Sequence, residues 1–518
     1  MEFRRAAGIL LHPTSLPGKY GIGDLGPEAF EFIDFLTAAG QRLWQVFPLG
    51  PTGYGDSPYQ CFSAFAGNPL LISPDVLVAQ GFLSEDDLKG APDFEADKID
   101  YGPLIQWKKG LLGVAFQGFK SFINSGSAES KSVKTSFNKF CKANSSWLDD
   151  YALFMAAKEH HGGGQWTSWE PSIALRKPKE LGKWKKKLAE GIEFQKFQQF
   201  CFFDQWLKVK EYANSKNIQI IGDLPIFVAY DSADVWANKE LFTVDEEGKL
   251  IWVAGVPPDY FSPTGQLWGN PLYRWDEMEK DDFAWWRGRI AALLNIVDII
   301  RIDHFRGFQA YWRIPGGAPT AEKGKWIKAP GMKFFRTVKE YLGEVPIIAE
   351  DLGVITPPVE KLRDAFNFPG IKIMQFAFGT GMEAKFLPHN YIRNCVVHTG
   401  SHDNDTTRGY FDSVRLDKSD IYEFAQNYLN CYKHEAMVAA AIKAAYASVA
   451  NTVVIPMQDV LNLGNSARMN FPGKLGGNWS WRAEKENFTD DLAAYFNYMT
   501  KIYERGISSA VSDKEAGK

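Results

Sequence analysis

Eight short apolar runs recur along this chain, and each of them ends in polar or turn-forming residues. Most are rich in valine and isoleucine and are apolar on both faces, which is typical of strands in a buried parallel sheet. Eight such strands with helices between them predict a (β/α)₈ barrel of the TIM type. The runs are residues 7–11, 43–47, 218–224, 297–303, 345–350, 371–376, 396–402 and 453–457.

Helical patterns fill several of the intervals between these runs. After Pro27, apolar residues repeat at helical spacing at positions 32, 35, 36 and 39, and Gly40 follows as a C-cap. Residues 433–449 also have strong helical character. The alternation of strand and helix therefore continues over most of the chain, and we expect residues 1–505 to form a single catalytic barrel.

Two long intervals predict insertions into this barrel. About 170 residues separate the second and third runs, and they include helical segments, so we expect a mostly helical subdomain over 70–215. A second insertion is predicted over 225–295. It contains the Gly/Pro-rich stretch 255–273, and a loop this long is usually functional. We expect no C-terminal β-domain after residue 457, and a disordered tail over 506–518.

Charge and cysteine usage exclude several classes of function. The net charge of −4 gives no basic field for nucleic acid or anionic lipid. The five cysteines are never spaced as CxxC, so a disulfide framework or zinc site is not expected. An apolar run of about 18 residues, as a membrane span requires, is absent from the sequence. We therefore expect a reducing compartment, the cytoplasm, with the plastid stroma as the alternative for a mature chain.

One nucleotide-like motif is rejected on its context. Residues 21–26 match GxGxxG, but the preceding strand ends about ten residues earlier, and the next run ends without an acidic residue. Metal-ligand patterns such as HExxH or an EF-hand loop are also absent from the sequence. We therefore expect neither a cofactor nor a metal.

Four of the apolar runs end in carboxylates, at the end of a barrel strand where catalytic groups lie. A single strand-end acid is often a helix cap, but four at the same end of different strands favour a shared site. Strand alternation also places Arg301 on the same face as Asp303. The four acids are Asp223, Asp303, Glu350 and Asp403.

Cleavage of a glycosidic bond requires two carboxyl groups, one protonated and one ionised. Asp303 lies beside Arg301, and we expect that cation to keep it ionised. Glu350 follows the apolar residues 346–349, and burial there is expected to raise its pKa. His304 and His402 lie next to the acids, where they could form hydrogen bonds with sugar hydroxyls. The high content of Trp and Tyr also suits a groove that stacks sugar faces.

Several motifs together carry a resemblance to a known family. They are GYGDSPY at 53–59, GDLPIFV at 222–228, the stretch 255–273, RIDHFRG at 301–307, IAEDLG at 348–353 and HDND at 402–405. The combination resembles glycoside hydrolase family 77, the amylomaltases and plastid disproportionating enzymes that act as 4-α-glucanotransferases. The resemblance runs from about residue 7 to residue 505.

This resemblance implies a role for each site residue. Asp303 would be the nucleophile, Glu350 the general acid/base and Asp403 the transition-state stabiliser of a retaining transfer between malto-oligosaccharides or other α-1,4-glucans. The residues Arg301, His304 and His402 would surround the −1 sugar, and Tyr59, Asp223, Trp268 and Asn470 would be further substrate contacts. At position 471, directly before Pro472, the resemblance leads us to expect a small or polar residue, but this chain has Phe471. The oligomeric state is not fixed by these patterns.

Two other functions share these carboxylates. A hydrolase on the same scaffold would release sugar to water, and a non-catalytic glycan-binding protein would keep the fold alone. The stretch 255–273 bears on this choice, because glycines and prolines there flank Tyr260, Phe261 and Trp268. We interpret these aromatic residues as a semi-rigid lid that covers the acceptor subsites and excludes water. The alternative interpretation is a structural loop packed on the barrel rim.

Overall fold

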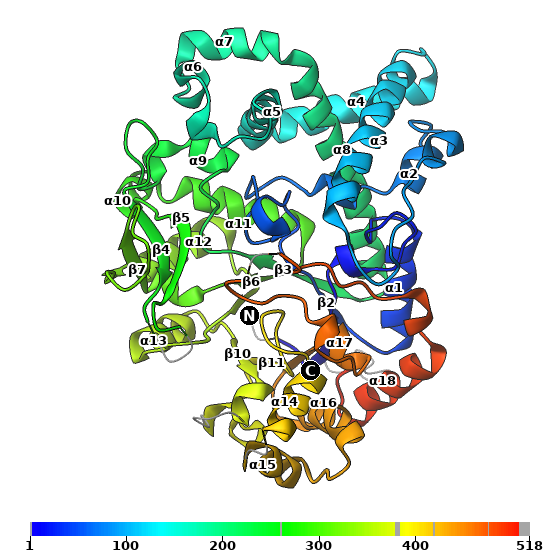
Figure 1. The fold of residues 1–518 in the computed structure, drawn as a ribbon, viewed down its shortest axis with the longest axis vertical. Helices are drawn as coiled ribbons and strands as arrows, with labels where there is room; N and C mark the ends of the chain where they lie inside the picture. Colours follow the sequence, from blue (N-terminus) through cyan, green and yellow to red (C-terminus); the bar gives the residue numbers. More distant parts are fainter. Residues whose placement is uncertain (1–2, 259–261, 379–383, 418–419, 475, 507–518) are drawn as a thin grey trace, which may run out of the picture.

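A computed structural model describes residues 3–258, 262–378, 384–417, 420–474 and 476–506. Each of the eight predicted runs overlaps a strand, and these strands close into a parallel barrel in the order β1-β12-β11-β10-β9-β6-β3-β2 (Figure 1). The bounds are β1 Ala6–Leu10, β2 Leu43–Gln45, β3 Gln219–Leu224, β6 Ile299–Ile302, β9 Ile347–Ala349, β10 Gly370–Ile373, β11 Cys395–His398 and β12 Thr452–Pro456. The predicted fold class is therefore confirmed.

The register of neighbouring strands brings the strand-end acids to one rim of the barrel. In β3, Asp223 pairs with Arg301 of β6, and Ile302 of β6 pairs with Ala349 of β9. Asp303 and Glu350 are the next residues after β6 and β9, so the two carboxyl groups leave the sheet at the same level. The seventh strand is shorter than the predicted run 396–402, because β11 ends at His398 and the segment 399–406 after it is a loop.

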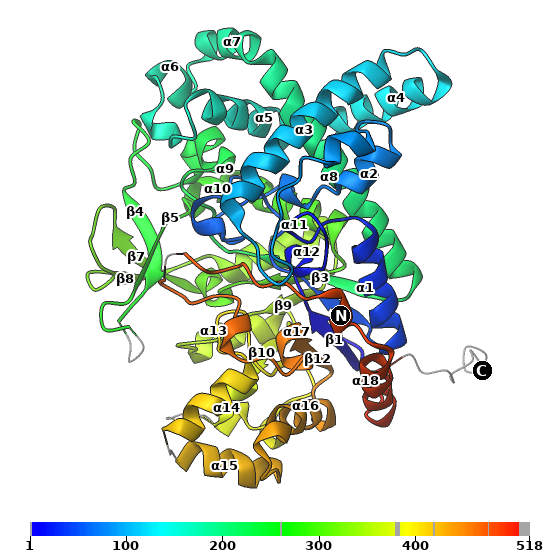
Figure 2. The same ribbon diagram turned by 45° about the vertical axis from the view of Figure 1, so that its right-hand side comes forward.

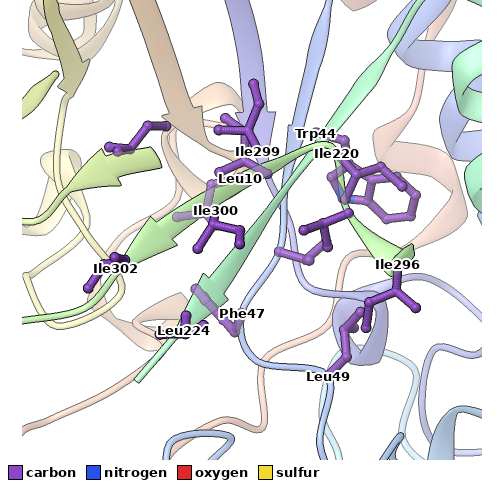
Figure 3. Packing of buried hydrophobic residues seen from close by; sticks show 14 of the residues in the cluster. Leu10, Trp44, Phe47, Leu49, Ile220, Leu224, Ile296, Ile299, Ile300 and Ile302 are labelled. Atoms are coloured by element: carbon purple, nitrogen blue, oxygen red, sulfur yellow. The ribbon is translucent and has the colours of Figure 1, made fainter. Parts of the chain in front are cut away.

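Apolar side chains from alternate strand positions fill the space between the barrel and its helices. Ile300 and Ile302 are fully buried on the face opposite Arg301, as the alternation predicts, and Figure 3 shows them among the core residues. Trp44 is also fully buried, and its indole Nε1 donates to the Leu11 carbonyl at 2.7 Å. A tightly packed core of this kind fixes the positions at which the strands end.

Helices occupy the long interval between β2 and β3. Figures 1 and 2 place them together at one end of the molecule. Their packing relies on phenylalanine, and the rings of Phe119 and Phe197 have centroids 4.9 Å apart. The helices are α2 Pro74–Ala79, α3 Tyr101–Ile123, α4 Ala128–Ala143, α5 Ser145–His160, α6 Pro171–Ala174, α7 Pro178–Lys187 and α8 Ala189–Ser215.

The other helices alternate with the barrel strands. The predicted helix after Pro27 is α1, and Gly40 follows its end with φ of +68°. The helix predicted over 433–449 is α16, Met437–Ala447, preceded by a 3-10 turn. The remaining bounds are α1 Pro27–Ala38, α9 Ala233–Ala237, α10 Trp275–Met278, α11 Ala284–Ile296, α12 Gly331–Leu342, α13 Pro357–Ala365, α14 Thr407–Leu416, α15 Asp420–Leu429, α17 Met457–Val460 and α18 Asp490–Ile502.

A second, four-stranded sheet lies beside the barrel and was not predicted from the sequence. Its order is β5-β4-β7-β8, with antiparallel pairing, and Figure 2 shows it at one side of the molecule. Within the stretch 255–273, residues 255–256 and 266–271 are therefore strands of a β-hairpin, where the sequence predicts an irregular loop. Gly265 in its turn has φ of +68°, and a Cβ there would lie 2.4 Å from the Val256 carbonyl oxygen. The strands are β4 Trp252–Val256, β5 Gln266–Pro271, β7 Ala310–Pro315 and β8 Lys325–Lys328.

The described residues after Pro456 form helical turns and helices and contain no further strand. Among all the described residues, none of the helices is both long enough and apolar enough to cross a membrane. The tail predicted over 506–518 lies almost wholly outside the described residues.

Candidate active site

Arg301 lies at the centre of the carboxylates on the barrel rim. Its Nη1 donates to Asp223 Oδ2 at 2.5 Å and to Asp303 Oδ1 at 3.1 Å. Tyr59 Oη donates to the same Asp223 oxygen at 2.8 Å. The structure thus brings together four of the predicted residues, which come from the ends of β3 and β6 and from the loop after β2.

Glu350 is oriented by main-chain donors. The His304 amide donates to Oε2 at 2.7 Å, and the Leu352 amide donates to Oε1 at 2.9 Å. His304 can reach Glu350 because its backbone has φ of +49°, a left-handed conformation that is uncommon for a residue other than glycine. The RIDH turn after β6 and the AED turn after β9 therefore interlock, and they place Asp303 and Glu350 in one site.

Burial controls the pKa of both carboxyl groups. It raises the pKa of Glu350, while Arg301 and the two amide donors lower it, and the net direction is upward as predicted. Burial also raises the pKa of Asp303, and Arg301 lowers it by less. The sequence predicts that Arg301 keeps Asp303 ionised, but the structure shifts the pKa of Asp303 in the opposite direction, because desolvation of the carboxyl group outweighs the ion pair.

The two predicted histidines are neutral for the same reason. Burial lowers the pKa of His304 to about 3, with a further contribution from Arg306, and it also lowers the pKa of His402. Trp268 of β5 lies edge-on to His304, with 4.8 Å between ring centroids. A neutral imidazole has both a donor and an acceptor nitrogen, which suits a sugar hydroxyl.

An aromatic cluster surrounds His402. Tyr59 stacks on it with 5.0 Å between centroids, Phe47 lies edge-on at 4.9 Å, and Trp479 lies at 5.6 Å. Sequence reasoning missed Phe47 and Trp479. Phe47 lies at the end of the apolar run 43–47. Trp479 is remote in sequence from every strand end and has no local signal except its residue type.

Asp403 is held from the C-terminal part of the chain. Asn470 Nδ2 donates to Asp403 Oδ1 at 2.6 Å, and the Asn470 amide donates to the His402 carbonyl at 3.1 Å. His402 Nε2 lies 3.4 Å from Asp403 Oδ1. Asn470, which the resemblance predicts to be a substrate contact, binds Asp403 in this structure and joins the segment 465–473 to the loop after β11.

Two predicted lid residues, Tyr260 and Phe261, lie outside the described residues. Trp268, the third, is described and belongs to an edge strand of the second sheet. Among the described residues, no group of three or more His, Cys, Asp or Glu side chains is arranged to hold a metal ion.

Comparisons with known proteins identify the family. The model of a family described as 4-alpha-glucanotransferase, glycoside hydrolase family 77, matches residues 11–487. The 4-alpha-glucanotransferase of Synechocystis sp. is 50% identical, over 97% of this chain and 99% of that protein. The 4-alpha-glucanotransferase of Thermus thermophilus is also 50% identical, over 98% of this chain and 100% of that protein.

A solved structure supports the same assignment. The amylomaltase from Streptococcus agalactiae, in complex with acarbose, aligns with a TM-score of 0.92 and 41% sequence identity. The alignment covers 97% of this chain and 100% of that chain. Together with the barrel and its rim of carboxylates, these matches show that the chain is an enzyme that belongs to the 4-alpha-glucanotransferase family.

Proposed function

We propose that this enzyme transfers α-1,4-glucan segments from a donor malto-oligosaccharide, starch or glycogen chain to an acceptor glucan or glucose. Asp303 is the nucleophile, Glu350 is the acid/base and Asp403 stabilises the transition state. The observation that carries this proposal is the pair Asp303 and Glu350, which leave neighbouring strands at the same rim and interlock through the His304 amide.

The first half of the reaction breaks the donor bond. Glu350 gives its proton to the glycosidic oxygen, and the released glucan leaves with that proton. Asp303 attacks the anomeric carbon and forms a covalent β-glycosyl ester. The contact with Arg301 occupies Asp303 Oδ1, and the side chain is 30% exposed, so Oδ2 is the oxygen that a sugar can reach. The upward shift in the pKa of Glu350 favours the protonated form needed for this step.

The second half reverses these roles. Glu350, now a carboxylate, takes the proton from the 4-hydroxyl of the acceptor, whose oxygen attacks the anomeric carbon and displaces Asp303. Two inversions give a product with the α configuration of the donor. Positive charge develops on the sugar in both transition states, and the carboxylate of Asp403 would stabilise it.

Polar atoms without protein partners support binding of a sugar at this point. Asp223 Oδ1 and His304 Nε2 are buried, and neither has a hydrogen-bond partner among the residues that the structure describes. Buried polar groups normally form hydrogen bonds, so these atoms are suited to hydroxyl groups of a substrate. Tyr59, His402 and Trp268 add ring faces and edges next to them.

Exclusion of water separates a transferase from a hydrolase. The hairpin of β4 and β5 carries Trp268 against His304, which places a large apolar side chain beside the reacting groups. We assign a lid function to this hairpin, and Tyr260 and Phe261, which lie between β4 and β5 in the sequence, belong to the same proposal. A lid that excludes water keeps the covalent intermediate from hydrolysis until an acceptor sugar binds.

The same proposal covers the organisation of the chain and its location. Residues 1–505 act as one catalytic unit, into which 70–215 and 225–295 are inserted. The described cysteines are all free thiols, as a reducing compartment requires, and this fits the cytoplasm or, as the alternative, the plastid stroma.

The test is incubation with maltotriose, followed by chromatography of the products. We expect glucose together with oligomers longer than maltotriose. Asp303→Asn should lower the rate by more than about 10³-fold, because the covalent step is lost. Glu360→Gln is the control, since this carboxyl group is exposed on α13 and does not lie at the end of a strand. Glucose and maltose without longer oligomers would identify a hydrolase, and a wild-type protein without turnover would identify a binding protein.

A further inference from the structure

A small cavity lies behind the loop that carries Asp403. This loop, residues 399–406, follows β11, and the side chain of Asp403 is 47% exposed. The cavity lies between the loop and the ends of β1 and β12. It is lined by His12, Gln458 and the loop's own Gly400 and Ser401, among others. The neighbouring His402 packs into the aromatic cluster, whereas the partly exposed Asp403 side chain depends on hydrogen bonds for its position.

Arg468, which also lines this cavity, provides such contacts. Its Nη2 donates to the Asp403 carbonyl at 2.6 Å, its Nε donates to the Asn470 carbonyl at 2.8 Å, and its Nη1 forms an ion pair with Asp405. The Arg468 side chain is only 14% exposed. One guanidinium thus fixes the main chain of Asp403 and the main chain of Asn470, whose side chain holds the Asp403 carboxylate.

Phe471 covers the guanidinium of Arg468. The centre of its ring lies 4.0 Å from Arg468 Cζ, and Lys474 Nζ lies 5.1 Å from the same centre. The Phe471 amide donates to Asn478 Oδ1 at 3.0 Å, which fixes the ring's position along the chain. The resemblance leads us to expect a small or polar residue at this position. In this chain the aromatic ring of Phe471 instead stacks on the Arg468 guanidinium.

We propose that Arg468 is a positioning residue for Asp403 and that Phe471 keeps the guanidinium in the orientation this requires. The proposal rests on the role of Asp403 given above. Arginine suits the task because its planar fork serves three acceptors in fixed directions, which a lysine ammonium does not reproduce. Loss of the fork removes the side-chain donors of the Asp403 and Asn470 carbonyls, so Asp403 is expected to shift.

The first test replaces the guanidinium. Arg468→Met and Arg468→Lys should each lower kcat for maltotriose disproportionation about 10- to 100-fold, the range for hydrogen bonds to charged groups. The KM should change by less than about threefold. Lys474→Met is the matched control, because Lys474 lies over the same ring, and it should stay within about twofold of the wild type.

The second test asks whether Arg468 acts through Asp403. In a double-mutant cycle, Arg468→Met should cost less than about threefold when Asp403→Asn is already present, because the shared contribution is lost only once. Equal losses in both backgrounds would show that Arg468 acts independently and would overturn the proposal. If Asp403→Asn alone kept the wild-type kcat, the role of Asp403 itself would be wrong, which is a distinct result.

Variants of Phe471 provide a further test should the Arg468 variants fold poorly. Phe471→Leu should lower kcat about 3- to 10-fold, within the range for loss of a cation–π contact, while Phe471→Tyr retains the ring and should restore it. A Phe471→Leu enzyme with wild-type kcat, or a Phe471→Tyr enzyme as slow as Phe471→Leu, would contradict the role given to the ring. Near-ultraviolet circular dichroism checks that each variant is folded.

Discussion

Neutralising Asp223 tests the electrostatics of the nucleophile. The buried charge of Asp223 raises the pKa of Asp303, after the larger effect of burial and against Arg301. The substitution Asp223→Asn keeps the shape of the side chain and removes this charge. We therefore expect the pKa of Asp303 to fall, and the acidic limb of the kcat/KM profile to move to lower pH, because Asp303 must be ionised to attack.

The geometry bounds the size of this effect. Asp223 Oδ2 and Asp303 Oδ1 are bound to the same Arg301 nitrogen at 2.5 and 3.1 Å, so these two oxygens are at most 5.6 Å apart. At that separation two unit charges repel by about 0.7 kcal/mol in water and by about 3 kcal/mol at an effective dielectric constant of ~20. With about 1.4 kcal/mol for each pH unit, the limb should move by roughly 0.5 to 2 pH units.

The assay measures initial rates of maltotriose disproportionation from about pH 4 to about pH 9, at substrate concentrations well below KM. Tyr59→Phe is the control, since it removes the hydroxyl that donates to Asp223 but leaves the carboxylate charged. Its kcat/KM should fall while its acidic limb moves much less. An Asp223→Asn profile that is lower in height but unchanged in pH would refute the reasoning, because the limb would then belong to another group.

Three further predictions address the acid/base, the hairpin and the helical insertion. Glu350→Gln should abolish the basic limb of the pH–rate profile, because the raised pKa of Glu350 keeps this acid protonated at higher pH. With an activated glycosyl fluoride donor, this variant should retain more activity than with maltotriose. An unchanged basic limb would assign that limb to another group. Trp268→Ala should raise the ratio of hydrolysis to transfer at least about threefold. Leu267→Ala, at an exposed neighbour on β5, should not change this ratio. Equal ratios in both folded variants would exclude the lid. Gly118→Ala in α3 should destabilise the protein by about 1–3 kcal/mol, because its Cβ would lie 2.1 Å from the Phe82 carbonyl oxygen. Gly110→Ala in the same helix has open space and should raise the unfolding temperature slightly, so a common sign in thermal melts would contradict this packing argument.

The barrel strands could be predicted because their signal is local. A buried parallel strand must be apolar on both faces, so 297–303 and 345–350 are recognisable without knowledge of their neighbours. Carboxylates directly after such runs lie at one rim in any barrel, which is why Asp303 and Glu350 could be assigned to one site. Helices with apolar spacing, such as α1, followed from the same local reasoning.

Features that depend on partners remote in sequence required the tertiary structure. The hairpin of β4 and β5 is part of a larger sheet because β7, which begins about 40 residues after the end of β5, pairs with β4. Arg468 and Trp479 enter the site from a segment without regular strands, and neither residue type nor spacing indicates which loop they contact.

The pKa of Asp303 shows the same division between sequence and structure. The sequence places Arg301 two residues away, and this neighbour alone predicts an ionised carboxylate. The structure adds the desolvation of the site and the nearby charges of Asp223, Glu350 and Asp403, which together raise the pKa. The local pattern is enough to place the carboxylates at one rim. Their depth of burial follows from the packing of distant segments around them, and burial sets the free-energy cost of their charges.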